Sequence, residues 1–164
     1  MNGRRWLLTG GALGVAALVA HRFLRPGAPE AAEIFPVTHS DAEWRARLSA
    51  DQYAVLRQEG TERPFTSPLL QEHRKGVFGC AGCDLDLFAS ETKFESGTGW
   101  PSFWKPLDHA VGETSDTAFL MDRTAVHCGQ CGGHLGHVFS DGPPPTGLRY
   151  CMNGVALTFR PTTA

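Results

Sequence analysis

The five cysteines of this 164-residue chain form two C-x-x-C pairs and leave one residue unpaired. Cys80 and Cys83 make the first pair, Cys128 and Cys131 make the second, and 44 residues separate them. Two such knuckles can bring four thiolates to a tetrahedral ion, and Zn²⁺ is commonly held in this way. Four sulfur ligands leave no open coordination position, so the pattern predicts one closed, structural Zn²⁺ site per chain.

Two disulfides, or two redox-active C-x-x-C pairs, are the alternatives for these four cysteines. Disulfides would suit an oxidising compartment. However, the knuckles CAGC and CGQC are rich in glycine, which lets backbone amides approach metal-bound sulfur. His127 and His134 flank the second knuckle and could replace a thiolate, although four thiolates make neither necessary.

The unpaired Cys151 lies in the segment TGLRYCMNG, residues 146–154. If this segment is a strand, its alternation places Arg149, Cys151 and Asn153 on one face. A cation near a thiol favours the thiolate, which is the nucleophilic form. The segment thus predicts a reactive cysteine, and the alternative is a buried cysteine that acts as a small hydrophobic residue.

Two histidines in GGHLGHVFSDG strengthen the first interpretation. His134 and His137 are three residues apart and would point to opposite faces of a regular strand. Gly132, Gly133 and Gly136 favour a bent backbone, which would let both rings reach one site. If sulfur satisfies the metal, proton transfer is a suitable role for at least one of them.

The segment ESGTGWPSFWKP, residues 95–106, places three aromatic residues on a loop constrained by glycine and proline. These residues are Trp100, Phe103 and Trp104. They could form part of the core, or an apolar wall that receives a small apolar group of a substrate.

Short strands are expected to position these residues. From about Val77 onward, the runs VFGC, AFLM, AVHC, HVFS, LRYCM and VALTF alternate with glycine, proline and aspartate, a pattern typical of antiparallel strands joined by turns. The run DGPPPTG, residues 141–147, predicts a rigid, exposed loop that leads into the strand of Cys151. The expected fold class is therefore mainly β.

Two short helices are expected before the strands. Ser40 is followed three residues later by Glu43, and Ser49 by Gln52, which is the spacing of a capping box in both cases. Trp44 and Leu48 then share one face of the first helix.

The first residues of the chain predict a targeting signal rather than a part of the folded domain. Arg4 and Arg5 precede an uncharged, mostly apolar run, residues 6–20, which is too short and glycine-rich to span a bilayer comfortably. The start resembles a twin-arginine export signal, with a membrane anchor or a chance basic start as alternatives. We expect residues 1–36 to be signal and linker, residues 37–164 to be the domain, and the protein to be exported, either periplasmic or membrane-anchored and facing the periplasm.

The charge of the chain argues against nucleic acid as a partner. Of 15 basic and 17 acidic residues, four basic and one acidic lie within residues 1–32, so the rest carries a net charge of −5. Such a body lacks the basic surface that nucleic-acid binders usually show.

Several blocks together resemble the B-type methionine sulfoxide reductase family. They are GTERPFTSPL, CAGC, FESGTGWPSFWKP and RTAVHCGQCGGHLGHVFSDGPPPTGLRYCMNGVALTF, which cover about residues 40–160. The resemblance implies two antiparallel sheets bound by a cysteine-ligated zinc. It also implies thiol-dependent reduction of methionine-R-sulfoxide, while a separate enzyme type reduces the S epimer.

The resemblance assigns roles residue by residue. It makes Cys151 the nucleophile that attacks the sulfoxide sulfur and becomes a sulfenic acid. His137 corresponds to the residue that helps protonate the oxygen, and His134 to one that assists through water. Asn153 matches a residue that positions this hydrogen-bond network. The matching substrate-binding residues are Trp100, which holds the methyl group, Phe103 beside it, and Asp141 and Arg149, which shape the pocket.

The chain departs from the family pattern at two positions. Many members carry a resolving cysteine where this chain has Thr98, and the chain has no sixth cysteine. If zinc holds four cysteines, an outside thiol must reduce the sulfenic acid, which implies a thioredoxin-like protein or a small thiol as reductant. The second departure is Ala125, where many relatives carry glutamate, and a weaker ion pair is expected there.

Other functions compete with this interpretation. A non-catalytic zinc module that binds another protein would need Cys151 to be merely structural. A zinc-ribbon binder of nucleic acid would bind phosphate in a salt-dependent way, and a cysteine hydrolase would need an oxyanion hole, for which no signature is evident. A monomer is the default expectation.

Overall fold

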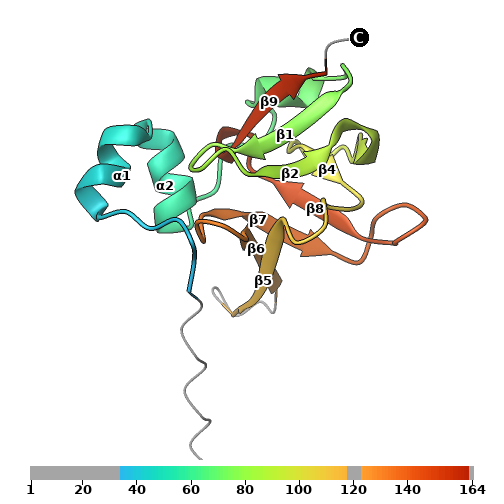
Figure 1. Cartoon of the computed structure of the whole chain (residues 1–164). Helices are drawn as coiled ribbons and strands as arrows, with labels where there is room; N and C mark the ends of the chain where they lie inside the picture. The colour runs from blue at the N-terminus through green and yellow to red at the C-terminus, as the bar shows by residue number, and fades with distance from the viewer. Residues whose placement is uncertain (1–33, 118–122, 163–164) are drawn as a thin grey trace, which may run out of the picture. The chain divides into compact units, whose positions relative to one another are not determined.

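The computed structural model describes residues 34–117 and 123–162, and its elements belong to one compact unit that starts at Ile34. Two antiparallel sheets dominate it (Figure 1), which confirms the mainly β expectation. The small sheet has the order β2-β1-β9 and the large sheet the order β3-β4-β8-β7-β6-β5. The strands are β1 (Gly76–Cys80), β2 (Asp86–Ala89), β3 (Lys93–Phe94), β4 (Ser102–Phe103), β5 (Val111–Asp116), β6 (Arg123–Cys128), β7 (His134–Phe139), β8 (Arg149–Met152) and β9 (Leu157–Pro161).

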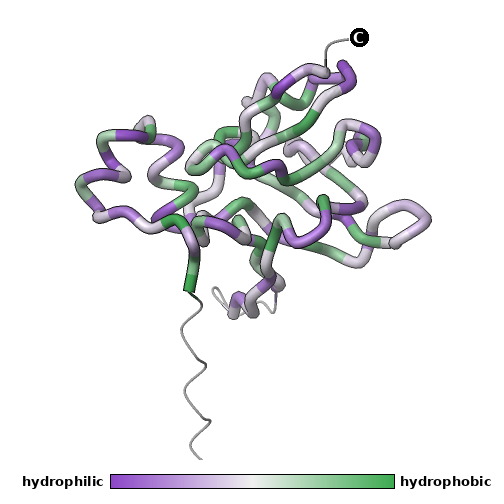
Figure 2. Tube along the Cα trace, in the orientation of Figure 1, coloured by the Kyte–Doolittle hydropathy of each residue, from purple (hydrophilic) through white to green (hydrophobic). Residues whose placement is uncertain are grey.

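Two helices precede the strands, as the sequence predicted. They are α1 (Asp41–Arg47) and α2 (Ala50–Gln58), and each begins with a capping box, at Ser40 and at Ser49. Both box residues satisfy backbone N–H groups that the first helical turn leaves without partners. Figure 2 shows hydrophobic and hydrophilic colouring alternating along both helices, as expected for elements with one buried face.

Three short 3₁₀ helices complete the described elements: η1 (Pro68–Gln71), η2 (Ser90–Thr92) and η4 (Gly154–Ala156). The last of them corrects one strand boundary. The run VALTF was expected to be extended throughout, but Val155 and Ala156 lie in η4 and β9 begins at Leu157. The expected strand AFLM and the expected export signal lie outside the described residues.

An aromatic cluster joins the two sheets. Phe78 on β1 and Phe88 on β2 pack on Phe103 of β4, with ring centroids 4.9 Å and 4.4 Å from that of Phe103. All three side chains are fully buried. The expectation that Phe103 lies beside Trp100 at the substrate is therefore corrected, because the register of β4 turns this ring into the core.

Strand β8 lies inside the large sheet, between β4 and β7. The loop before it, residues 141–147, projects from the sheet in Figure 1 and returns the chain antiparallel to β7. Within the described residues, no helix is long and apolar enough to cross a membrane.

Candidate active site and metal site

The four paired cysteines meet at one point. Their sulfur atoms all lie within 4.8 Å of one another, with 3.7 Å between Cys80 and Cys131 and 3.5 Å between Cys83 and Cys128. Each knuckle is a turn at the end of a strand, the first after β1 and the second after β6. The sequence prediction that the two pairs converge is confirmed, and all five cysteines of the chain are free thiols.

The electrostatics of this cluster fit a bound cation. Hydrogen bonding to Cys128 and Cys131 raises the pKa of the Cys80 thiol above its usual range. Hydrogen bonds from Cys131 and Cys80 lower the pKa of the Cys128 thiol. Together the thiols resist holding four negative charges so close to one another, and a divalent metal ion would remove that repulsion.

Residues at the start of the described domain contact the second cysteine knuckle. The Val37 backbone N–H donates to the carbonyl of Gln130 at 3.0 Å, and the Arg57 guanidinium donates to the carbonyl of Cys131 at 3.0 Å. The same guanidinium lies over the Trp44 ring. These contacts explain why three of the four cysteines are buried, and they give the two short helices a structural purpose.

The surroundings of Cys151 differ from those of the four clustered cysteines. It is partly exposed on β8, opposite Ser102 of β4 on one side and opposite His137 of β7 on the other. Its thiol opens on a pocket of about 140 Å³. The pocket is lined by Thr61, Trp100, Arg123, Gly136, His137, Phe139, Cys151 and Asn153.

An irregularity in β7 brings the two histidines together, as the glycines had suggested. Val126 pairs with Gly136 and His127 with His134, so β7 holds one extra residue between these pairs. Gly136 has φ of 158°, and a Cβ at this position would lie 2.1 Å from the carbonyl oxygen of Cys151, so another residue would clash there. The rings of His134 and His137 meet edge to face, with centroids 5.3 Å apart.

The two histidines differ in burial. His134 is 7% exposed, and its Nε2 atom has no hydrogen-bond partner among residues 34–117 and 123–162. Burial lowers the pKa of His134 to about 4, so this ring is neutral at neutral pH. His137 instead contacts a carboxylate, that of Asp116, which sequence reasoning missed.

Asn153 directly follows β8, which ends at Met152, and it lines the same pocket as Cys151. Its side chain is buried and bridges two segments of backbone. The amide nitrogen donates to the Leu135 carbonyl at 3.0 Å, and the amide oxygen accepts from the Glu62 N–H at 2.8 Å. These two backbone contacts fix the position of the side chain at the pocket.

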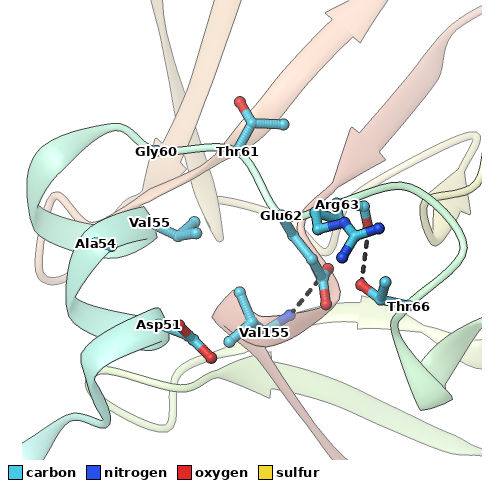
Figure 3. Close-up of a pocket in the computed structure, with 9 residues that line it drawn as sticks. All are labelled: Asp51, Ala54, Val55, Gly60, Thr61, Glu62, Arg63, Thr66 and Val155. Carbon is cyan, nitrogen blue, oxygen red and sulfur yellow. Dashed lines mark hydrogen bonds between the residues drawn. The ribbon is translucent and has the colours of Figure 1, made fainter.

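Glu62 is a second residue that sequence reasoning missed. Its backbone carbonyl accepts from the Trp100 indole at 2.9 Å, while its carboxylate accepts from the N–H groups of Gly154 at 2.7 Å and Val155 at 3.3 Å. Figure 3 shows the carboxylate directed at Val155. The partners lie up to 93 positions away, so no local pattern announces them.

Arg149 and Asp141 form a bidentate ion pair, with both N–O distances at 2.9 Å. The hydrogen bonds that Arg149 donates to Asp141 raise the pKa of Arg149 and lower the pKa of Asp141. The guanidinium lies 4.4 Å from the Phe139 ring centroid. Phe139, rather than Phe103, is the second aromatic residue of the pocket beside Trp100.

Thr98 occupies the position at which many family members are expected to carry a resolving cysteine. Its hydroxyl lies 3.7 Å from the Cys151 sulfur. The hydroxyl of Ser96 lies 2.9 Å from that of Thr98 and 2.7 Å from that of Ser102. A chain of three hydroxyl groups thus begins beside the Cys151 thiol and ends at the buried Ser102.

Comparison with known proteins places the chain in a family. Residues 48–161 match the SelR domain. A peptide methionine sulfoxide reductase MsrB of Agrobacterium fabrum is 55% identical over 126 residues, which are 76% of this chain and 93% of that relative. The MsrB of Pseudomonas putida strain W619 is 60% identical over 120 residues, which are 73% of this chain and 90% of that relative.

The chain therefore belongs to the SelR family, and within it to the B-type methionine sulfoxide reductases. It is an oxidoreductase, a peptide-methionine (R)-S-oxide reductase.

Proposed function

We propose that this protein repairs oxidised methionine, free or within proteins, by attack of the Cys151 thiolate on the sulfur of methionine-R-sulfoxide. The observation that carries the assignment of residues is the pairing of Cys151 with His137 across β7 and β8, at a small pocket that Trp100 also lines. A nucleophile beside an acid is what this reaction needs, because the sulfoxide oxygen leaves poorly until it is protonated.

The reductive step transfers one oxygen atom. The thiolate sulfur forms a bond to the sulfoxide sulfur while His137 gives a proton to the oxygen. The protonated oxygen then bonds to the Cys151 sulfur, while its bond to the substrate sulfur and the bond between the two sulfur atoms break. Cys151 thereby becomes a sulfenic acid, and methionine leaves with the electron pair on its sulfur. His134 assists through water, and its neutral state suits the role of a hydrogen-bond partner rather than that of an acid.

Outside thiols would then restore the enzyme. A first thiol condenses with the sulfenic acid to give a mixed disulfide and water, and a second thiol releases Cys151 and leaves as the disulfide. Thr98 beside the sulfur supports this route, since a hydroxyl cannot form the internal disulfide. The reductant would be a thioredoxin-like protein or a small thiol.

The pocket residues would orient the substrate. Trp100, held through its indole nitrogen, would contact the methyl group, and Phe139 would supply the rest of the apolar surface. Asn153 would fix the backbone around the histidines. Arg149 and Asp141 would shape the polar rim through their ion pair.

The four-cysteine cluster would hold one Zn²⁺ ion with a structural role. Cys80, Cys83, Cys128 and Cys131 supply four soft donors in the set that zinc prefers, and they leave no position for substrate. The ion would contribute folding free energy, because it neutralises the crowded thiolates.

Export remains part of the proposal. Arg4 and Arg5 before an apolar run support a twin-arginine signal. This route carries folded proteins and would let zinc bind before export. The protein would then act as a monomer on oxidised proteins outside the cytoplasm.

Turnover of the separate R and S epimers of a blocked methionine sulfoxide, with dithiothreitol as reductant, tests the proposed function. We expect turnover of the R epimer alone, and its loss in Cys151→Ser with zinc content unchanged. Absence of turnover by zinc-replete, folded protein would replace the enzyme with a zinc module that binds another protein.

A second experiment tests the recycling route. After one turnover without reductant, a sulfenic-acid reagent should label Cys151, as read by mass spectrometry of peptides. An internal disulfide to Cys151 at this stage would overturn recycling by outside thiols.

A further inference from the structure

His137 has a second neighbour, which comes from β5, whereas Cys151 comes from β8. Its Nε2 atom lies 2.8 Å from Oδ2 of Asp116, the last residue of β5. Both side chains are largely buried, at 16% and 19% exposure. A carboxylate at this distance from an imidazole in a partly dry site is a strong, charge-assisted contact when the ring is protonated.

The contact crosses a whole strand. β6 lies between β5 and β7, and on it Ala125 pairs with His137 on one side and with Thr114 on the other. Asp116 is two residues beyond Thr114, so it shares the face of Thr114 and stands diagonally from Ala125. Because Ala125 presents only a methyl group, the carboxylate reaches the ring beside it. A cavity of about 640 Å³ borders Ala125, Asp116 and both histidines.

The surrounding charges favour an ionised carboxylate. Arg123 of β6 donates to the same Oδ2 atom at 2.7 Å, which stabilises the negative charge. Among residues 34–117 and 123–162, the other titratable groups that face His137 are His134 on its own strand and Cys151 on β8, while Glu59 lines the same cavity. An ionised carboxylate only accepts hydrogen bonds, so the proton in this contact belongs to Nε2 of His137.

We propose that Asp116 is a positioning residue of the reductive step, which holds the His137 ring by its Nε2–H and stabilises the protonated ring that acts as the acid. Nδ1 is then the ring atom that exchanges a proton with the sulfoxide oxygen. The inference rests on the proposed function, since it supplies the partner of the acid in that reaction.

The neighbouring histidine sharpens this assignment. Burial holds the pKa of His134 at about 4, so this ring is neutral, and its Nε2 atom has no hydrogen-bond partner in the described part of the chain. His137, three residues on, has the carboxylate. The two rings thus have different roles: His137, which contacts the Asp116 carboxylate, carries the proton, and His134 remains a neutral hydrogen-bond partner.

The first test is Asp116→Asn, which keeps the shape and removes the charge. We expect the rate of methionine formation in a single turnover of the R epimer to fall about 10- to 100-fold, with KM changed less than kcat. Glu113→Gln is the matched control: it lies on the same strand, pairs with the Tyr150 hydroxyl and should leave the rate within about twofold.

A rescue experiment separates positioning from a structural role. A glutamate at position 125 would face His137 directly across β6 and β7. In the Asp116→Asn background, Ala125→Glu should recover a large part of the lost kcat. Ala125→Gln in the same background should not recover it.

The tautomer of His137 gives a test that needs no variant at position 116. In ¹⁵N NMR spectra of wild type at a pH where the ring is neutral, Nε2 should be the protonated nitrogen and Nδ1 the bare one. A bare Nε2 would overturn the inference. So would an Asp116→Asn variant that is folded, binds zinc and keeps more than half of the wild-type rate.

Failure of the proposed function looks different. In that case wild type itself would form no methionine from the R epimer, whatever the residue at position 116.

Discussion

Two groups of cysteines in one small fold have opposite environments. The paired cysteines lie in a crowded, mostly buried cluster beneath two helices, with sulfur atoms within 4.8 Å of one another. Cys151 is partly exposed, and its sulfur lies beside the hydroxyl of Thr98 at a small pocket.

The difference shows that the neighbours of a thiol decide its chemistry. Four thiols at short distance cannot all ionise without a cation, so their placement suits a metal and removes them from reaction with substrate. A single thiol opposite a histidine has no such competition and can serve as a nucleophile. Changes in either region should therefore separate stability from turnover.

The largest difference should come from replacing one cysteine by serine in each region in turn. Cys80→Ser removes a buried ligand, so we expect loss of zinc and a fall in the free energy of unfolding of more than about 5 kcal/mol. Cys151→Ser should keep one zinc per chain and the wild-type Tm. Metal analysis and thermal unfolding check both, and a zinc-replete, stable Cys80→Ser protein would break the comparison.

His134 lies between the two regions, three residues after Cys131, and should make stability depend on pH. Its pKa of about 4 in the fold is below the ordinary value of 6.5, so between these values the unfolded chain binds a proton that the native protein does not. Stability is therefore complete above about pH 6.5 and falls by up to roughly 3 kcal/mol as the pH approaches 4.

Urea unfolding at a series of pH values, for wild type and for His134→Asn, measures this contribution. Acid release of metal affects both proteins alike. The difference between their slopes of unfolding free energy against pH therefore measures the contribution of His134. Equal slopes would show that burial of this ring has no energetic consequence.

Glu62 should matter to the Cys151 region alone. Glu62→Ala leaves the N–H groups of Gly154 and Val155 without their carboxylate, at a cost of about 2 kcal/mol. It should also raise KM several-fold, because the backbone that holds Trp100 loosens, while zinc content stays unchanged. Glu62→Gln retains an acceptor oxygen and is the matched control. Loss of zinc in the alanine variant would mean that the regions are coupled.

Thr98 should have the smallest effect. Thr98→Val keeps the shape and removes the hydroxyl beside Cys151, which should slow alkylation of this thiol by iodoacetamide about two- to fivefold, an energy of about 0.5–1 kcal/mol. Thr98→Ser should react at the wild-type rate. An unchanged rate in the valine variant would remove the hydroxyl chain from any account of reactivity.

Local patterns predicted those features whose causes are local. The capping boxes at Ser40 and Ser49 place the interacting groups three residues apart, and both are present. The two C-x-x-C turns each set a pair of thiols, and the chemistry of zinc predicted that the two pairs would converge, as they do. The bend at Gly136 was likewise expected from composition, and it brings the rings of His134 and His137 together.

Features that depend on register were predicted less well. Alternation along β8 did not predict that the Asn153 amide would contact the backbone of Leu135 and of Glu62, because both partners come from other segments. An aromatic loop does not reveal which ring faces inward, and β4 turns Phe103 into the core while Phe139 of β7 reaches the pocket.

The sequence by itself determined the chemical inventory of this protein: four cysteines for a metal, one left to react, histidines near it and a family whose blocks span the body. The tertiary structure decided the partners, namely Asp116 for His137 and Glu62 for Trp100, Asn153 and η4. These contacts join residues far apart in the chain, across strands whose register follows from packing of the whole core. A short sequence window holds no record of that register, and so the partners of the reactive groups emerge only when the sheet is complete.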